Sequence, residues 1–296
     1  MPPLKIGVSL SAGGSATATE IRDNAVHAEQ AGLDSAFVGD QLLSFRPILD
    51  STVALASAAA VTSRIELGYG TMVLALRPVA WAAKQIATLQ QLSGDRVILG
   101  VGVGGSMYGE AGWRAVGVPY RERGKRTDAA LDVLPDLVTG KPAVVNGQEV
   151  ALNPGANVPP IWVGGGSDAA LRRAVRYGAA WFPSMMPAAQ LPPALARLAE
   201  FADAAGRPVP ALTLGGVAGI GGEQSAMDEY GAMLAKTYGV PEEAAVKLPI
   251  TGNARQAADQ LAEYAGAGVR HLVLGLVGGE WKRQCDLLAE AKALLD

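Results

Sequence analysis

Short apolar runs alternate with segments of helical periodicity along nearly the whole chain. The apolar runs read as strands, and they cover residues 4–10, 35–40, 65–73, 96–104, 159–166, 179–184, 211–220 and 271–278. The helical segments that follow them cover residues 17–32, 50–62, 78–94, 122–140, 168–178, 191–206, 223–267 and 281–295, and the segment 223–267 is expected to break near Pro241 and Pro249. Strands that are buried on both faces read as continuous apolar runs, and their alternation with helices indicates a parallel sheet. Eight such units favour one α/β domain over residues 1–296, a (β/α)8 TIM barrel.

Capping residues and turn signals sharpen these boundaries. We expect Thr19 to cap the first helix and Asp50 to cap the second, since both side chains can accept a hydrogen bond from a free N–H group. Gly94 suits the end of the third helix. One insertion interrupts the alternation: residues 142–152 contain Asn146-Gly147, which is typical of a two-residue β-hairpin turn.

Composition narrows the classes of function. A chain of 296 residues with 49% hydrophobic content can bury a large core. The net charge of −3 and the lack of a Lys/Arg cluster argue against nucleic-acid binding. No apolar run reaches about 18 residues, so no membrane helix is expected. The N-terminal sequence lacks an apolar signal region, which predicts a cytoplasmic protein.

The few cysteine and histidine residues give little support to metal binding or thiol chemistry. The single cysteine, Cys285, excludes an intrachain disulfide and a cysteine zinc cluster. His27 and His271 are the two histidines, and we expect both to be structural, so no metal site is predicted. Trp162 and Trp181 lie within strands and are expected in the core.

Glycines gather where four of the strands end. The second strand ends in Gly39-Asp40-Gln41, and the third runs from Gly70 through Thr71 and Met72 to Val73. The fourth ends in residues 102–106, which include Val103 and Gly104, and the fifth in residues 164–167. Active sites of parallel barrels lie on the loops after the strands, so these loops are the candidate site.

The stretch "IWVGGGSDAALRRA", residues 161–174, combines a strand, three glycines and a helix start. Glycine lets the backbone approach a ligand closely, and the first turn of a helix offers free N–H groups to an anion. We therefore predict a phosphate site here, with Ser167 as a further donor and with Arg172 and Arg173 supplying charge. Asp168 could cap the helix instead, and a tight turn without a ligand stays open as the alternative. Neither a P-loop nor a Rossmann fingerprint is present.

Several segments together resemble the luciferase-like monooxygenase superfamily. They are "AEQAGLDSAFVGDQ" (28–41), "ATLQQLSGDRVILGVGVGG" (87–105), "GVPYRERGKRTDAAL" (117–131), "PPIWVGGGSDAALRRAVRYGAAWFP" (159–183) and "YAGAGVRHLVL" (264–274). The resemblance covers residues 5 to 290 and is greatest to the F420-dependent branch, with FMN as the alternative cofactor. It implies a phosphate grip on Gly164, Gly165, Gly166 and Ser167. It also implies ring contacts from Asp40, Thr71, Met72, Val73, Val103 and Gly104, and a non-prolyl cis peptide at Met72-Val73.

The chain departs from this resemblance at two positions. Many F420-dependent alcohol and sugar-phosphate dehydrogenases carry Asp-His after the second strand, whereas this chain has Asp40-Gln41. Glutamine cannot take a proton at neutral pH. Gly105 stands near the position of a glutamate in the sugar-phosphate enzymes. Both departures favour a reductase over a base-dependent dehydrogenase. Asp40, Gln41 and Tyr108 are the candidate catalytic residues, although Tyr108 also suits a lid.

The resemblance therefore implies an F420-dependent oxidoreductase, expected to pass a hydride from reduced F420 to a small organic substrate. Two alternatives stay open: an FMN-dependent monooxygenase that uses reduced flavin and O2, and a flavin-binding relative without catalysis. Expected partners are the small-molecule substrate, an enzyme that reduces the cofactor and a second copy of the chain. Relatives often dimerise through the second and third helices, and the Ala-rich segment 50–62 suits close packing.

Overall fold

A closed ring of parallel strands forms the centre of the computed structural model, which describes residues 3–10, 17–44, 47–105, 109–238, 242–246 and 248–295. Neighbouring strands pair in the order β11-β1-β2-β3-β4-β7-β8-β9, and β9 also pairs with β11 and so closes the ring. These eight strands are β1 (Lys5–Ser9), β2 (Ser35–Val38), β3 (Glu66–Val73), β4 (Val97–Gly102), β7 (Ile161–Gly164), β8 (Ala180–Phe182), β9 (Ala211–Ile220) and β11 (His271–Leu276). The predicted (β/α)8 barrel and all eight predicted strands are confirmed.

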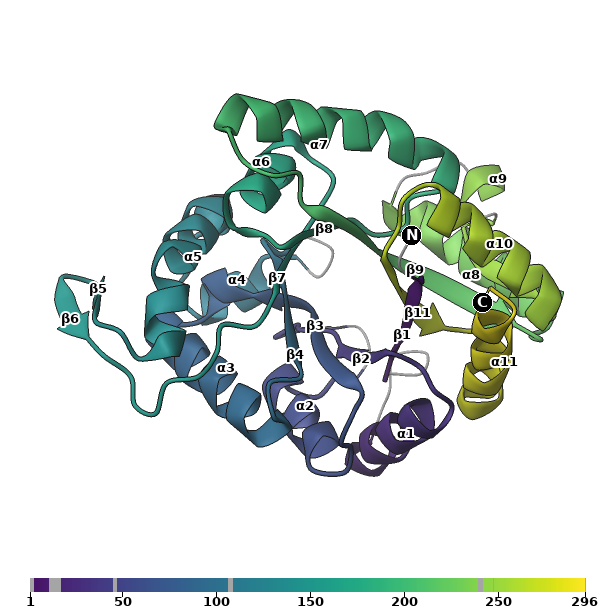
Figure 1. Cartoon of the computed structure of the whole chain (residues 1–296), viewed down its shortest axis with the longest axis horizontal. Helices are drawn as coiled ribbons and strands as arrows, with labels where there is room; N and C mark the ends of the chain where they lie inside the picture. The colour runs from purple at the N-terminus through teal and green to yellow at the C-terminus, as the bar shows by residue number, and fades with distance from the viewer. Residues whose placement is uncertain are drawn as a thin grey trace.

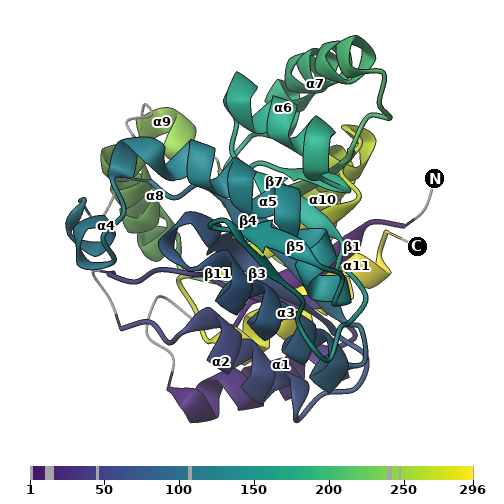
Figure 2. The ribbon, with the colours of Figure 1, turned by 90° about the vertical axis from the view of Figure 1, so that its left-hand side faces the viewer.

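Helices surround the strands on every side of the view in Figure 1. The longer ones are α1 (Ala18–Gln30), α2 (Ser51–Ala59), α3 (Val79–Ser93), α5 (Arg123–Thr139), α6 (Asp168–Tyr177), α7 (Leu191–Ala205), α8 (Gln224–Tyr238), α10 (Ala254–Gly266) and α11 (Trp281–Ala293). Two short helices, α4 (Ala111–Ala115) and α9 (Glu242–Ala245), lie at the same end of the molecule in the side view of Figure 2. Within the described residues, no helix is both long and apolar enough to cross a membrane.

The capping residues and turn signals predict the element boundaries correctly, with two exceptions. Asp50 caps α2 as predicted, and the hairpin of β5 (Ala143–Val145) and β6 (Gln148–Val150) turns at Asn146 and Gly147. The first helix is capped by Thr17 and not by Thr19, because Thr17 and Glu20 form a reciprocal capping box. The segment 223–267 also contains a strand, β10 (Ile250–Gly252), which pairs with the end of β9.

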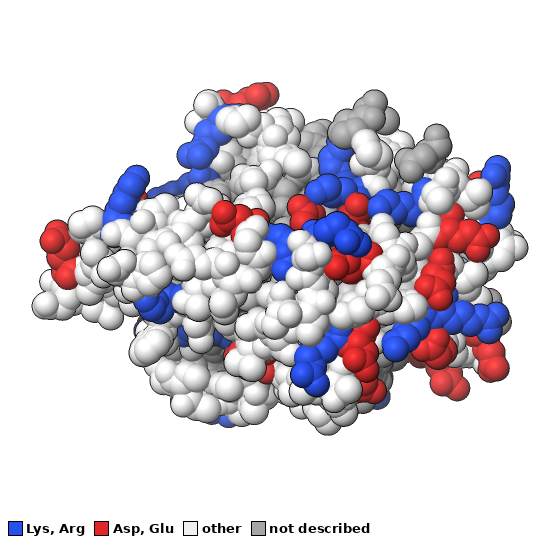
Figure 3. All heavy atoms as spheres, turned by 60° about the horizontal axis from the view of Figure 1, so that its bottom comes forward, with Lys and Arg blue, Asp and Glu red and all other residues white. Residues whose placement is uncertain are grey.

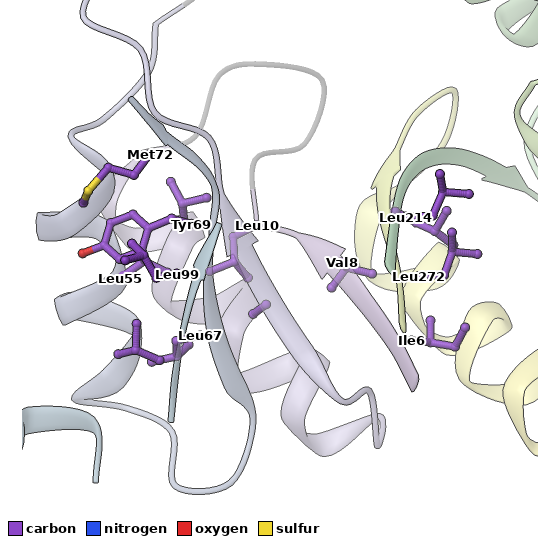
Figure 4. Close-up of a cluster of buried hydrophobic side chains, with 14 of the residues drawn as sticks. Ile6, Val8, Leu10, Leu55, Leu67, Tyr69, Met72, Leu99, Leu214 and Leu272 are labelled. Carbon is purple, nitrogen blue, oxygen red and sulfur yellow. The ribbon is translucent and has the colours of Figure 1, made fainter. Parts of the chain in front are cut away.

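The outward faces of the strands form the main core. Val8, Leu67, Leu99 and Leu214 are among the fully buried side chains that point from the strands towards the helices, as Figure 4 shows. Removal of this apolar surface from water is the main favourable contribution to folding, at about 25 cal/mol for each Å² buried. Trp181 belongs to this core, as predicted.

A second, smaller core fills the inside of the barrel with aromatic rings, below the carboxyl ends of the strands. Phe37, Trp162 and Phe182 pack with ring centroids 5.3 to 6.0 Å apart. Glycine on the neighbouring strand makes this possible, because a Cβ atom added at Gly68 would lie 2.2 Å from the Phe37 ring. His271 also points inwards, with its ring 4.9 Å from that of Trp162. Of these rings, Phe37 and Phe182 line the space that remains towards the carboxyl ends of the strands, so the aromatic layer forms its floor.

His271 and Ser35 form a buried hydrogen bond across this floor, with 2.6 Å between Nε2 and Oγ. Burial, together with the charges of Lys5 and Lys292, lowers the pKa of His271 from 6.5 to about 3. The folded protein therefore holds a neutral imidazole at neutral and mildly acidic pH, in agreement with the structural role expected for His271.

This histidine predicts a loss of stability in acid. Between pH 6.5 and 3 the unfolded chain binds a proton at His271 that the folded protein excludes, so stability falls as the pH is lowered through this window. The loss amounts to about 1.4 kcal/mol per pH unit. Urea unfolding at pH 6.5 and at pH 5 should show this loss in the wild type. A His271→Asn variant should lack it, and equal pH slopes in the two proteins would contradict the assignment.

Candidate functional site

A cavity of about 520 Å³ opens at the carboxyl ends of the strands, above the aromatic floor. Among the described residues that line it, glycines are the commonest: Gly39, Gly70, Gly102, Gly104, Gly105, Gly164, Gly165, Gly215, Gly216 and Gly275. We call it the glycine cavity. These glycines come from strands or loops on most sides of the barrel, so a flat ligand could lie against bare main chain.

Side chains would crowd their neighbours at several of these glycines. A Cβ atom at Gly102 would lie 2.3 Å from Thr71 Oγ1, and one at Gly164 would lie 3.2 Å from Thr71 Cγ2. Gly104 has φ +68°, and a Cβ there would lie 2.7 Å from Trp113. The glycines thus let the backbone pack around Thr71 and still leave the centre of the mouth open.

A second cavity, of about 260 Å³, adjoins the first. We call it the Leu43 cavity. Both cavities are lined by Thr71, Gly39, Gly70, Gly104 and Gly105, so they meet at Thr71. The remaining wall is formed by Asp40, Gln41, Leu42, Leu43, Val73, Leu76, Gly109, Gly112 and Trp113. A bound ring and a second small molecule could therefore contact each other beside Thr71.

Asp40 connects the chain segments that form the rim, the boundary between these two cavities. Its carboxylate accepts hydrogen bonds from Val73 N–H and from Ser51 Oγ, each at 2.9 Å. Arg77 donates from both terminal nitrogens, at 2.5 and 2.6 Å. Burial opposes the charge of Arg77, but the hydrogen bonds to Asp40 and the nearby carboxylates outweigh it, so the pKa of Arg77 is raised. The Asp40 carboxylate is thus committed to joining β2, β3 and α2.

The loop between β7 and α6 has the features of an anion site. Gly165 has φ +105°, and residues 165–169 are exposed. Ser167 caps α6, with its side chain accepting from Ala170 N–H, so the hydroxyl proton can still be donated. The carbonyl of Gly165 accepts a hydrogen bond of 2.7 Å from Trp181 Nε1. The N–H groups of the first helical turn therefore face solvent beside the glycine cavity.

The arginines predicted for this loop are engaged elsewhere. Arg173 is buried and forms a hydrogen-bonded ion pair of 2.6 Å with Asp128 of α5, because the helix turns its side chain towards that neighbour. Arg172 lies over the Phe201 ring, 3.8 Å from Asp168. Asp168 lies in the first turn and also pairs with Arg197 of α7 at 3.0 Å. Main-chain N–H groups and Ser167 are therefore the donors that this loop directs to the rim.

The structure brings most of the predicted site residues to one place. Those that line one or both cavities are Asp40, Gln41, Thr71, Val73, Val103, Gly104, Gly164 and Gly165. Gly166 and Ser167 follow at the exposed rim. The side chain of Met72 is fully buried in the main core, so it faces away from both cavities. Tyr108 lies outside the described residues. The non-prolyl cis peptide lies at Gly70-Thr71 and not at Met72-Val73, which corrects the prediction.

Sequence reasoning missed the part of the wall that comes from the other side of the barrel. Ser184, Gly215, Gly216 and Gly275 line the glycine cavity, from β9, β11 and the segment after β8. Their signal was available, since glycine inside an apolar strand often marks a close approach of a ligand or backbone. Among the described residues, no group of His, Cys, Asp and Glu side chains is arranged to hold a metal ion.

Comparison with known proteins gives this geometry a context. Residues 3–218 match the family described as luciferase-like monooxygenase. A protein of unassigned function from Mycobacterium tuberculosis is 34% identical over 57% of this chain and 60% of its own length. An F420-dependent glucose-6-phosphate dehydrogenase from Kineococcus radiotolerans is 32% identical over 60% of this chain and 55% of its own length. The match thus spans little more than half of these relatives.

Solved structures agree on the architecture. An F420-dependent secondary alcohol dehydrogenase, solved in complex with an F420-acetone adduct, superposes over 100% of both chains with a TM-score of 0.84. Its sequence identity is 17%, so the likeness concerns the fold.

The hydrogen-bonded ion pair between Asp40 and Arg77, which we call the rim clamp, predicts a specific loss of stability. Asp40→Asn should lower the free energy of unfolding by about 3 kcal/mol, because Arg77 would keep its charge with its main partner removed. Asp50→Asn is the matched control: Asp50 is half exposed and 3.7 Å from Arg77, and asparagine caps a helix equally well. Urea unfolding of the three proteins measures the difference. Similar losses in both variants would show that the clamp contributes little.

Proposed function

Because the chain belongs to the luciferase-like monooxygenase family, we propose that it is an F420-dependent oxidoreductase which reduces a small organic substrate. The observation that carries the proposal is the glycine cavity, whose wall reaches Gly164 and Gly165, just before the exposed first turn of α6. F420 consists of a tricyclic ring and a phosphate-containing tail. The bare main chain fits the ring, and the N–H groups of residues 166–169 fit the phosphate. The name of the Kineococcus relative supports F420 over FMN.

Each part of the site then has a role. Gly164, Gly165 and Ser167 hold the tail, while Thr71, Val103 and Gly104 bound the ring. Bound F420 supplies or accepts the hydride. The residues of the chain orient the two reactants so that they meet beside Thr71, whose hydroxyl can donate to a substrate oxygen. Asp40 acts as a positioning residue, because its carboxylate keeps Val73 and Arg77 in place.

The ionisable groups of the two cavities support one direction of the reaction. Among the described residues that line the two cavities, Asp40 is the one ionisable side chain, and four hydrogen bonds already engage it. Oxidation of an alcohol needs a base that removes the hydroxyl proton. Reduction needs a proton that water can supply. We therefore propose net reduction, with reduced F420 delivered by a separate enzyme.

Titration with F420 and with FMN tests the cofactor. We expect F420 to quench the protein's fluorescence with a dissociation constant in the micromolar range, and FMN to bind more weakly. Gly215→Leu should weaken F420 binding more than about 10-fold, because the new side chain would enter the cavity. Gly266→Leu is the matched control, since no atom lies within 4 Å of a Cβ at that exposed position.

Stronger binding of FMN, or equal effects of the two leucines, would overturn the assignment. The family description also favours a second candidate, a monooxygenase that uses reduced FMN. Anaerobic turnover separates the two, because a monooxygenase requires O2 and a reductase does not. Consumption of reduced F420 without O2 supports the reductase. Tight binding of F420 without turnover of any ketone or enone would indicate a non-catalytic relative.

We further propose that two copies of the chain associate through α2 and α3. Val53 on α2 and Trp81 and Leu92 on α3 have exposed fractions of 68%, 68% and 65%. Trp81 and Leu92 are eleven residues apart, so they lie on one face of the helix. Figure 3 shows few charged side chains on the left of the forward face, the side where α3 lies in Figure 1. A face of this kind suits a dimer interface.

Trp81→Glu should convert this dimer to a monomer, because a carboxylate would be buried at the interface without a partner. Sedimentation equilibrium of the wild type and the variant measures the mass directly. F420 binding should be unchanged in the variant, since Trp81 lines neither cavity. A monomeric wild type at micromolar concentration would contradict the proposed dimer.

A further inference from the structure

The Leu43 cavity has a mostly apolar wall. Leu42 and Leu43, which follow β2, are 52% and 45% exposed and contribute large apolar side chains to this wall. On the other side the wall is formed by Val73, Leu76 and Trp113. Burial of such surface by a ligand is favourable in proportion to the apolar area that leaves water.

The far side of this wall is held rigidly by a small core of its own. Trp113 is 5% exposed and packs with Val73, Ala75 and Val118. Its ring meets Tyr120 edge to face, with 5.5 Å between centroids. Because Gly104 lies directly against the indole, the same wall also borders the glycine cavity. The Trp113 side of the Leu43 cavity is thus packed against the protein in the absence of a ligand.

The charges of the described residues that line the cavity are balanced. Among the described lining residues there is no Lys, Arg or His, and the Asp40 carboxylate is neutralised by Arg77. The remaining polar groups include the Gln41 amide and the Thr71 hydroxyl. A phosphate or carboxylate placed here would gain no cation from the described lining residues, and loss of hydration without such a partner is unfavourable.

We infer that the Leu43 cavity receives the apolar body of an uncharged ketone or enone, and that Leu43 and Trp113 select against anionic substrates. The inference rests on the proposed function, and it differs from the phosphorylated substrate in the Kineococcus relative's name. In the reaction the substrate carbon gains a hydride, as the C–H bond of reduced F420 breaks. The π electron pair moves onto oxygen, or through the enone, and is protonated by water. Substrate is reduced and F420 oxidised by two electrons.

Steady-state kinetics with a matched pair of substrates test this selection. Cyclohexanone and its carboxylate-bearing analogue share the reacting group and differ in charge. With reduced F420, the wild type should favour cyclohexanone in kcat/KM by at least about 100-fold. Leu43→Arg should lower that ratio by about 10-fold or more, since it supplies a cation to the carboxylate. Val144→Arg is the control, because Val144 is 61% exposed on the hairpin and lines neither cavity.

The outcomes distinguish failure of the proposed function from failure of the inference about the Leu43 cavity. A wild-type protein that does not bind F420 would overturn the proposed function. Normal F420 binding with equal use of both substrates, or a ratio that Leu43→Arg leaves unchanged, overturns the inference about the cavity. Saturation-transfer NMR of the two compounds without cofactor examines the cavity by itself. Transfer to cyclohexanone that Leu43→Arg abolishes supports the inference, and equal transfer to both compounds overturns it.

Discussion

The packing of aromatic rings against glycines inside the barrel is the constraint on which the site depends. Phe37 occupies space that Gly68 leaves vacant, and Trp162 and Phe182 complete the layer. A barrel of this size has just enough room for its interior side chains. Because a few large rings fill the lower half, the upper half can be lined by glycine without collapse of the walls. The depth of the glycine cavity is thus set by residues that never reach its rim.

The clamp between Asp40 and Arg77 explains how two adjoining cavities keep separate characters. One carboxylate joins the ends of β2 and β3 to the start of α2, and its charge is cancelled where it lies. The glycine cavity can then offer main-chain donors while its neighbour stays apolar. A free carboxylate at the same point would instead attract cations and water to the boundary at Thr71.

Much of this architecture can be predicted from the sequence. The features that the sequence does not predict have physical causes. The eight strands were predictable because each is a continuous apolar run, and the hairpin because Asn146-Gly147 suits its turn. β10 has three residues, too few for a periodicity signal within a helical segment. The contributions of Gly215, Gly216 and Gly275 depend on ring closure, which joins strands far apart in the chain. The pairing of Arg173 with Asp128 likewise depends on which helices become neighbours.

The hydrogen bond from Trp181 to the carbonyl of Gly165 has a consequence for ligand capture. In a planar trans peptide the C=O and N–H bonds point in opposite directions. The indole draws the Gly165 oxygen back towards the barrel wall, and so the amide hydrogen of Gly166 is turned outwards. That amide is therefore aimed in advance, and an arriving anion does not have to order the loop at a cost in entropy.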